Sequence, residues 1–215
     1  MALCERYAEY LQRYLKDYGI SVDTKVLEIG GECIIDFKNE DLAKWLKEDC
    51  EEICTGSVDP YRHSYDGDEG EEETGEWDYE DYEDYEKRYW KLVDECTEEC
   101  HKRVDYATKG SLHIDYRTRT VVSSTIPISC SKVFSTGYSY GDEEEDVEQP
   151  WKELRERLIK AGCEVEEEVE KWIHQHEFAR DYLGAFEPDE EVPAICYIHP
   201  KRCRPEDIFR AIYGK

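Results

Sequence analysis

The sequence has few basic residues relative to its acidic ones, and it has no long apolar run. Its 215 residues hold 28 Lys and Arg against 54 Asp and Glu, so the formal net charge is -26. A protein this negative repels nucleic acid and anionic membranes, and it attracts basic protein surfaces and cations. No stretch approaches the roughly 20 apolar residues of a membrane-spanning helix. We therefore expect no direct binding to nucleic acid and no membrane association, and we expect a basic protein as partner.

The sequence motifs of common enzyme classes are also missing. There is no G-x-x-x-x-G-K-[ST], no G-x-G-x-x-G, no H-E-x-x-H and no G-x-S-x-G. A carboxylate pair could be hidden among so many acids, but no pattern identifies one, and His113 near Asp115 is too common an arrangement to name a catalytic dyad. We predict that the protein is not an enzyme, has no catalytic residues and needs no cofactor.

The N-terminal residues lack the basic region and apolar run of a secretory leader. We therefore expect a cytoplasmic protein, located in the host cell cytoplasm if a phage encodes it. In a reducing compartment, the ten Cys are expected first as free thiols in the core, second as metal ligands and third as disulfides.

Apolar and aromatic residues are plentiful enough for a packed core. Hydrophobic residues make up 39% of the chain, which excludes full disorder. Because 17 Tyr and five Trp stand beside a single Met, aromatic rings must supply much of the buried area and of any interface.

The first third of the chain reads as helix, hairpin, helix. Apolar residues at helical spacing predict a helix over 2–18, ended by Gly19. Two β-rich runs, 26–29 and 33–37, flank Gly30-Gly31 and predict a tight hairpin. Asn39 is then a predicted cap for a helix that runs to about Cys54.

The remainder alternates less regularly. A long helix is expected to emerge from the acidic tract and end near Val104, and the β-rich region 106–140 predicts an antiparallel sheet. A helix beginning at Pro150, a helical stripe over 165–183 whose early part could instead be a strand, a strand over 192–198 and a helix opened by Pro205 complete the chain.

This order predicts an α+β fold, in which amphipathic helices pack with a small antiparallel sheet and acidic loops lie on the surface. We divide the chain into an N-terminal helix-hairpin-helix segment (1–58), an acidic flexible linker (59–77) and a segment with a helix, the sheet and the C-terminal helices (78–215). The first and last segments could form one domain.

Two cysteine patterns raise the question of metal binding. Cys50 and Cys54, and then Cys96 and Cys100, are C-x3-C pairs on predicted helices that the acidic tract can connect as antiparallel neighbours. Four converging thiolates could bind zinc, with His101 as a substitute ligand. Zinc sites usually use shorter C-x2-C spacings, and a thiol on an apolar helix face behaves as a small hydrophobic group.

Cys196, His199 and Cys203 form a second candidate cluster, but it has no evident fourth ligand, and Pro200 and Pro205 indicate an ordinary loop. We predict no stoichiometric zinc at either place.

The acidic tracts are the largest anomaly. From Asp66 to Glu86, 13 of 21 residues are acidic, and from Asp142 to Glu148 six of seven are. The simplest interpretation is a solvated surface. Aromatic rings are interleaved with the acids of the first tract, which a purely solubilising tract does not need. Carboxylates on a helix could instead imitate the phosphates of a duplex, which presents one charge per ~1.7 Å, and the rings could enter base-stacking pockets.

We therefore predict a non-enzymatic, acidic nucleic-acid mimic that occupies the basic channel of a nuclease or other defence enzyme, such as a CRISPR effector or restriction nuclease. Residues 164–170 are a further negative patch. The candidate partner-binding residues are Trp77, Asp78, Tyr79, Glu80, Asp81, Tyr82, Glu83, Asp84, Tyr85, Glu86, Asp142, Glu143, Glu144, Glu145 and Asp146.

The alternative is a Cys/His metal-binding regulatory or scaffold protein whose acidity serves only solubility. A third hypothesis, tyrosine sulfation or phosphorylation within the Asp-Tyr-Glu repeats, is weaker because sulfation needs a secretory route.

Overall fold

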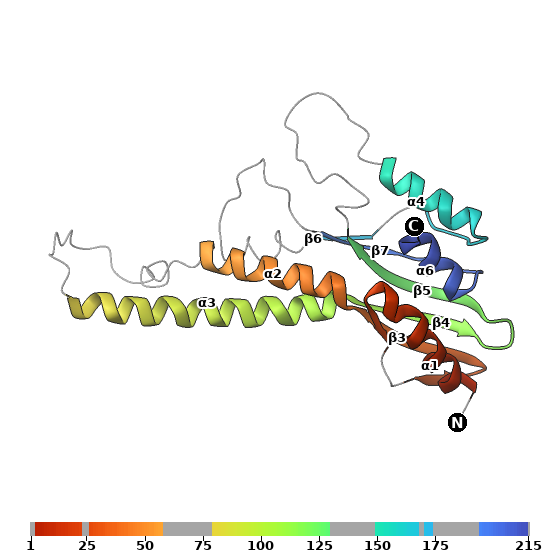
Figure 1. Cartoon of the computed structure of the whole chain (residues 1–215), viewed down its shortest axis with the longest axis horizontal. Coiled ribbons are helices and arrows are strands. Elements are labelled where there is room, and N and C mark those ends of the chain that lie inside the picture. Colours follow the sequence, from red (N-terminus) through yellow and green to blue (C-terminus); the bar gives the residue numbers. More distant parts are fainter. Residues whose placement is uncertain are drawn as a thin grey trace.

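The computed structural model of the chain describes residues 3–22, 26–57, 79–129, 149–167, 170–173 and 194–214. In these residues one antiparallel sheet packs with helices, so the predicted α+β class is confirmed (Figure 1). The strands are β1 (Ile20–Val22), β2 (Leu27–Ile29), β3 (Glu32–Asn39), β4 (Lys109–Asp115), β5 (Thr120–Ser129), β6 (Glu170–Ile173) and β7 (Ala194–Ile198).

The strand order of the sheet is β1-β3-β4-β5-β7-β6, and β2 also pairs with β3. The β3–β4 ladder joins strands that lie on either side of residues 58–78 in the sequence, with Ile35 opposite Leu112 and Phe37 opposite Gly110. A β-bulge interrupts the β4–β5 ladder near His113. The linker predicted at 59–77 lies outside the described residues, and the proposed domain division stays a prediction.

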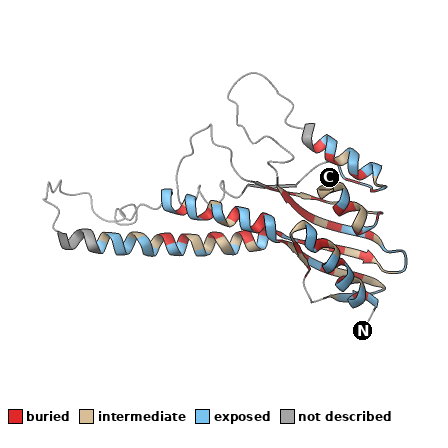
Figure 2. Ribbon diagram, in the orientation of Figure 1, coloured by how far each residue is buried: buried red, intermediate tan, exposed pale blue. Residues whose placement is uncertain are grey.

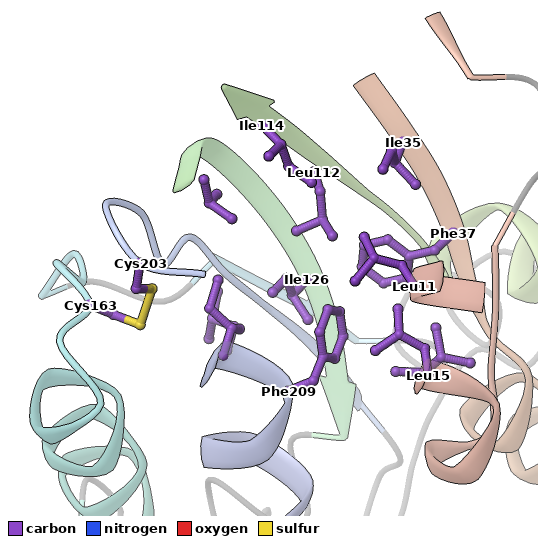
Figure 3. Packing of buried hydrophobic residues seen from close by; sticks show 14 of the residues in the cluster. Leu11, Leu15, Ile35, Phe37, Leu112, Ile114, Ile126, Cys163, Cys203 and Phe209 are labelled. Carbon is purple, nitrogen blue, oxygen red and sulfur yellow. A yellow bond between two sulfur atoms is a disulfide. The ribbon is translucent and has the colours of Figure 1, made fainter. Parts of the chain in front are cut away.

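Three helices cover one face of the sheet: α1 (Leu3–Leu15), α4 (Gln149–Lys160) and α6 (Pro205–Tyr213). A short 3-10 helix, η1 (Lys16–Tyr18), extends α1. Figure 3 shows Leu11 and Leu15 of α1 and Phe209 of α6 pointing toward the sheet residues, and all three side chains are fully buried. The main core therefore lies between these helices and the sheet.

The local signals of the first third are confirmed. Gly19 ends the first helical segment at φ 70°, and Gly30 and Gly31 form the β2–β3 turn at φ 61° and 93°. The helix α2 (Glu40–Ser57) begins after Asn39, whose Oδ1 accepts a hydrogen bond from the Leu42 N–H at 3.0 Å.

One strand of the sheet was not predicted, and a second was only an alternative. The strand β1 pairs with the end of β3, although its three residues carry too short a pattern to signal a strand. The early part of 165–183 is not a helix, because β6 pairs with β7 there, which matches the strand alternative. The remainder of that stripe, and the part of the predicted sheet beyond Ser129, lie outside the described residues.

The expectation of free thiols was wrong. All nine cysteines within the described ranges are disulfide-bonded, and two of the bonds, Cys4–Cys33 and Cys163–Cys203, lie in the main core. The expectation rested on an assumed reducing compartment, whereas the fold places the cysteines in pairs at bonding distance.

None of the helices described is both long enough and apolar enough to cross a membrane.

Candidate protein-binding site

The predicted acidic site lies on a helical hairpin formed by α2 and α3 (Tyr79–Ala107), which pack side by side and extend from one end of the sheet (Figure 1). Figure 2 shows the buried residues of both helices along the line where they meet. Leu42, Leu46, Val93 and Val104 are buried there, because their three- and four-residue spacing keeps them on one helix face.

Two disulfides cross-link the hairpin. Cys50 is bonded to Cys100 and Cys54 to Cys96, with Cα–Cα separations of 5.9 Å and 5.8 Å, inside the usual range for disulfides. The prediction that the two C-x3-C pairs lie on neighbouring antiparallel helices was correct, since each i, i+4 pair faces the other. All four cysteines are completely or almost completely buried. The hairpin is therefore covalently joined at two successive turns.

The base of the hairpin is attached to the sheet. Ile195 of β7 belongs to the same apolar cluster as the hairpin, and the Tyr197 hydroxyl donates a hydrogen bond of 2.9 Å to the Ala107 carbonyl. Lys38 of β3 and Lys47 of α2 bind one carboxylate oxygen of Asp105, at 2.7 Å and 2.8 Å.

Asp105 is therefore the charged contact that joins α3 to both α2 and the sheet. Partial burial opposes ionisation of its carboxyl group, yet the two lysines hold the pKa of Asp105 below its usual value.

Beyond the contacts with α2, the acidic end of α3 projects. Near the end of α2, the Tyr89 hydroxyl donates a hydrogen bond of 2.7 Å to the Thr55 carbonyl. Residues 79–88 precede this hydrogen bond and, at ~1.5 Å per residue, add about 15 Å of helix. Figure 1 shows this end of α3 extending past the end of α2. We call residues 79–88 the acidic arm.

The structure places the predicted site residues unevenly. Two of them, Asp84 and Glu86, have exposed side chains on the arm. Five more belong to the helical backbone of the arm: Tyr79, Glu80, Asp81, Tyr82 and Glu83. Tyr85 is half-buried and stacks on Tyr89, with ring centroids 6.5 Å apart. Trp77, Asp78, Asp142, Glu143, Glu144, Glu145 and Asp146 lie outside the described residues.

The aromatic rings around the arm have two different environments. Tyr89 packs against the hairpin cluster, so its ring is used inside the fold. The neighbouring Trp90 is 51% exposed, with its ring centroid 5.2 Å from that of Tyr89. Trp90 was not among the predicted site residues. Its position one residue after Tyr89 places it outside the helix face that contacts α2, and this spacing could have identified it as exposed.

Ion pairs neutralise part of the helix charge. The helix α2 contains six acidic and two basic residues, and α3 contains ten acidic and five basic residues. Four i, i+4 pairs run along α3: Arg88–Asp84, Lys91–Glu95, Lys102–Glu98 and Arg103–Glu99. The exposed acids of α2 and α3 that form no ion pair with a described residue are Asp41, Glu48, Glu51, Glu52, Glu86 and Asp94.

The further negative patch predicted at 164–170 has a different environment. The Glu164 carboxylate binds Arg202 at 3.0 Å and Lys201 at 3.7 Å. The backbones of Glu164 and Lys201 also exchange two hydrogen bonds of 2.9 Å. Glu164 therefore ties two segments of the chain together and is not a free surface charge.

The cysteines proposed as metal ligands in the alternative hypothesis are disulfide-bonded in this structure. Cys50, Cys54, Cys96 and Cys100 are bonded in pairs, and both Cys196 and Cys203 are disulfide-bonded. A sulfur in a disulfide is not the thiolate that zinc requires. The ring Nδ1 of His199 lies 2.8 Å from the Ser124 carbonyl oxygen. The signal that could have revealed the disulfides was the match between two i, i+4 cysteine pairs on antiparallel helices.

Comparison of the chain with family models, with curated proteins and with solved structures finds no match.

Proposed function

We propose that the protein is a non-enzymatic binding protein that inserts its acidic hairpin into the basic nucleic-acid channel of a partner enzyme. A CRISPR effector or a restriction nuclease has the kind of channel required. The observation that carries the proposal is the position of the acidic arm, which continues a disulfide-linked hairpin and extends away from the sheet.

Rigidity supports this use of the hairpin. A flexible acidic segment loses conformational entropy when it enters a channel, whereas a preformed helix has already been ordered by folding. The two disulfides and the Tyr89–Thr55 hydrogen bond hold α3 beside α2 up to the start of the arm. The projecting part can therefore reach into a groove while the sheet and its covering helices stay outside.

Charge supports the nature of the partner. The net charge of -26 accelerates encounter with a basic surface, and the exposed acids of α2 and α3 make the hairpin itself negative. The exposed ring of Trp90 lies beside the arm, where a base-stacking pocket of the partner could accept it.

The cytoplasmic location predicted from the sequence is part of this proposal only if disulfides can persist in that cytoplasm. Disulfides form and persist in oxidising compartments and are rare in the cytoplasm of most cells, with hyperthermophiles as an exception. Because the cysteines of the hairpin are all paired, the proposal requires a cytoplasm of that exceptional kind or action outside the cytoplasm.

The test uses purified enzymes with basic channels, CRISPR effectors and restriction nucleases among them, each cleaving a labelled DNA. In the arm variant, Asp78, Glu80, Asp81, Glu83 and Asp84 are changed to Asn or Gln. We expect the unmodified protein to inhibit at least one enzyme, and we expect the arm variant to inhibit it roughly tenfold more weakly because it loses the attraction to the channel.

The matched control removes the same number of charges away from the hairpin, at exposed Glu9, Asp17, Glu28, Glu153 and Glu156. This variant should inhibit as strongly as the unmodified protein. Equal loss in both variants would mean that only net charge matters. Inhibition of no enzyme, or a ternary complex in which the partner still holds its nucleic acid fully bound, would disprove the mimic.

A further inference from the structure

A cavity of about 390 Å³ lies where α2, α4, α6 and the end of β5 meet, apart from the acidic arm. Its volume is at the lower end of the ~300–1,000 Å³ typical of small-molecule sites. The walls include buried Leu42, Ile128 and Leu154, and they also include the aromatic rings of Trp45 and Tyr213. Trp45 is 39% exposed, so part of this side chain is accessible to a ligand.

One hydroxyl group in the wall is held in place by a buried amide. Asn39 is 4% exposed, and its Oδ1 accepts the Leu42 N–H, so its Nδ2 donates to the Tyr213 hydroxyl oxygen at 2.9 Å. The Tyr213 hydroxyl is thus an acceptor toward Asn39, and its own hydrogen has no acceptor among the residues described. Burial, together with the nearby Asp41 carboxylate, raises the pKa of Tyr213, so this hydrogen remains in place at neutral pH.

Two opposite charges also line the cavity. Asp41 comes from the first turn of α2 and Arg157 from the last turn of α4. Neither forms an ion pair with another described residue, and they do not pair with each other. Both residues are exposed, so a ligand in the cavity can reach their charged groups. A cavity with an unpaired carboxylate, an unpaired guanidinium and an apolar interior is suited to a ligand that carries both charges.

We propose that this cavity binds a small zwitterionic molecule with an apolar, preferably aromatic, body, which is the chemistry of an aromatic amino acid. The ammonium group faces Asp41, the carboxylate faces Arg157 and accepts from the Tyr213 hydroxyl, and the body lies against Trp45 and the buried aliphatic wall. This site is independent of the acidic arm and does not rest on its proposed function.

The first test needs no variant. Three ligands are titrated into the isotope-labelled full-length protein, and binding is followed by amide NMR shifts. They are L-phenylalanine, phenethylamine, which lacks the carboxylate, and 3-phenylpropionate, which lacks the ammonium group. We expect saturable shifts of cavity residues with L-phenylalanine and roughly tenfold weaker binding of each analogue, because each has lost one charged contact. No saturable binding of L-phenylalanine, or equal binding of all three molecules, would overturn the proposal.

The second test assigns each charge to its residue. Asp41→Asn should weaken the binding of L-phenylalanine but not that of 3-phenylpropionate, which has no ammonium group to lose its partner. Arg157→Gln should weaken the binding of L-phenylalanine but not that of phenethylamine, which has no carboxylate. Lys160→Gln on α4 and Glu48→Gln on α2 are matched controls outside the cavity and should change nothing. If Asp41→Asn and Arg157→Gln bind L-phenylalanine as the unmodified protein does, the ligand class is wrong.

A protein partner is the competing occupant. If Trp45→Ala weakens inhibition of a partner enzyme while L-phenylalanine produces no saturable shifts, the cavity receives a side chain of that partner and the small-molecule site is disproved.

Discussion

At the scale of single residues, Gly110 and Gly56 allow a direct comparison, because only one of the two positions excludes a larger side chain. Gly110 on β4 lies opposite Phe37, and a Cβ atom there would overlap the Phe37 ring and the Thr125 carbonyl. Gly56 lies in α2, and a Cβ atom there would meet no side chain of the described residues within 4 Å. One glycine is therefore required by packing, and the other only costs helix stability.

We expect Gly110→Ala to lower the free energy of unfolding by ~1–3 kcal/mol through overpacking, and Gly56→Ala to leave it unchanged or raise it by up to about 1 kcal/mol. Chemical denaturation of both variants measures the two values. A Gly110→Ala variant as stable as the unmodified protein would show that the sheet relaxes around the added methyl group.

Asp105 should make stability depend on pH. Because its folded pKa is lowered below the ordinary value of 3.8, the stabilisation it provides is present at neutral pH and is lost as the pH falls through the folded pKa. Asp105→Asn should therefore be less stable than the unmodified protein at pH 7, and the difference should shrink below about pH 3.8.

Denaturation curves at several pH values measure this difference. Glu98→Gln removes an exposed ion pair with Lys102 and serves as the control, with no comparable pH-dependent loss expected. A destabilisation by Asp105→Asn that is the same at low and neutral pH would point to lost packing and not to the two lysine contacts.

At the scale of elements, the hairpin depends on its disulfides. Its apolar cluster near the arm consists largely of cystine sulfur with Val93 and the half-buried Ile53 and Tyr89, so few other contacts hold the helices together there. Closing a loop of 50 residues, as Cys50–Cys100 does, stabilises a fold by about 4 kcal/mol in the chain-entropy model.

We expect loss of both bonds to destabilise the hairpin more than the main core. In a variant with Ser at Cys50, Cys54, Cys96 and Cys100, amide hydrogen exchange should become fast along the outer halves of α2 and α3, while β3, β4 and β5 stay protected.

Replacing only Cys54 and Cys96 should cost less than replacing all four cysteines. The remaining Cys50–Cys100 bond already restricts the unfolded chain, so the second bond closes a much shorter effective loop. Unchanged exchange in the four-serine variant would mean that apolar packing alone holds the hairpin.

At the scale of the whole molecule, the net charge of -26 opposes compaction. The arm variant removes five negative charges, four of which lie on the projecting end of α3, and it keeps side-chain size. The protein should therefore stay folded, and its free energy of unfolding should stay equal or rise as repulsion falls. The gain should be largest at low salt, because added ions screen exposed charges over ~8 Å at physiological strength.

Thermal unfolding at low and high salt measures this effect. A large loss of stability in the arm variant would show that the acids form structural contacts, and its weaker inhibition could then not be assigned to the partner interface.

Much of the element plan follows from local sequence. Apolar spacing places α1, α2 and the long helix α3, the Gly30-Gly31 pair marks the hairpin turn, and Asn39 marks the start of α2. These features depend on backbone preferences and on neighbours within one or two turns, so a sequence pattern suffices to predict them. The α+β class follows from their order.

Tertiary structure decided what distant residues do together. The pairing of β6 with β7, the cysteine pairs and the cavity between α2, α4 and α6 join residues far apart in sequence, and no local pattern encodes such contacts. The acidic residues show the same division. Their number is a property of the sequence, but only packing separates Asp105, which binds two lysines at the base of the hairpin, from the exposed Glu86 on the arm, because burial and partners set the role of each charge.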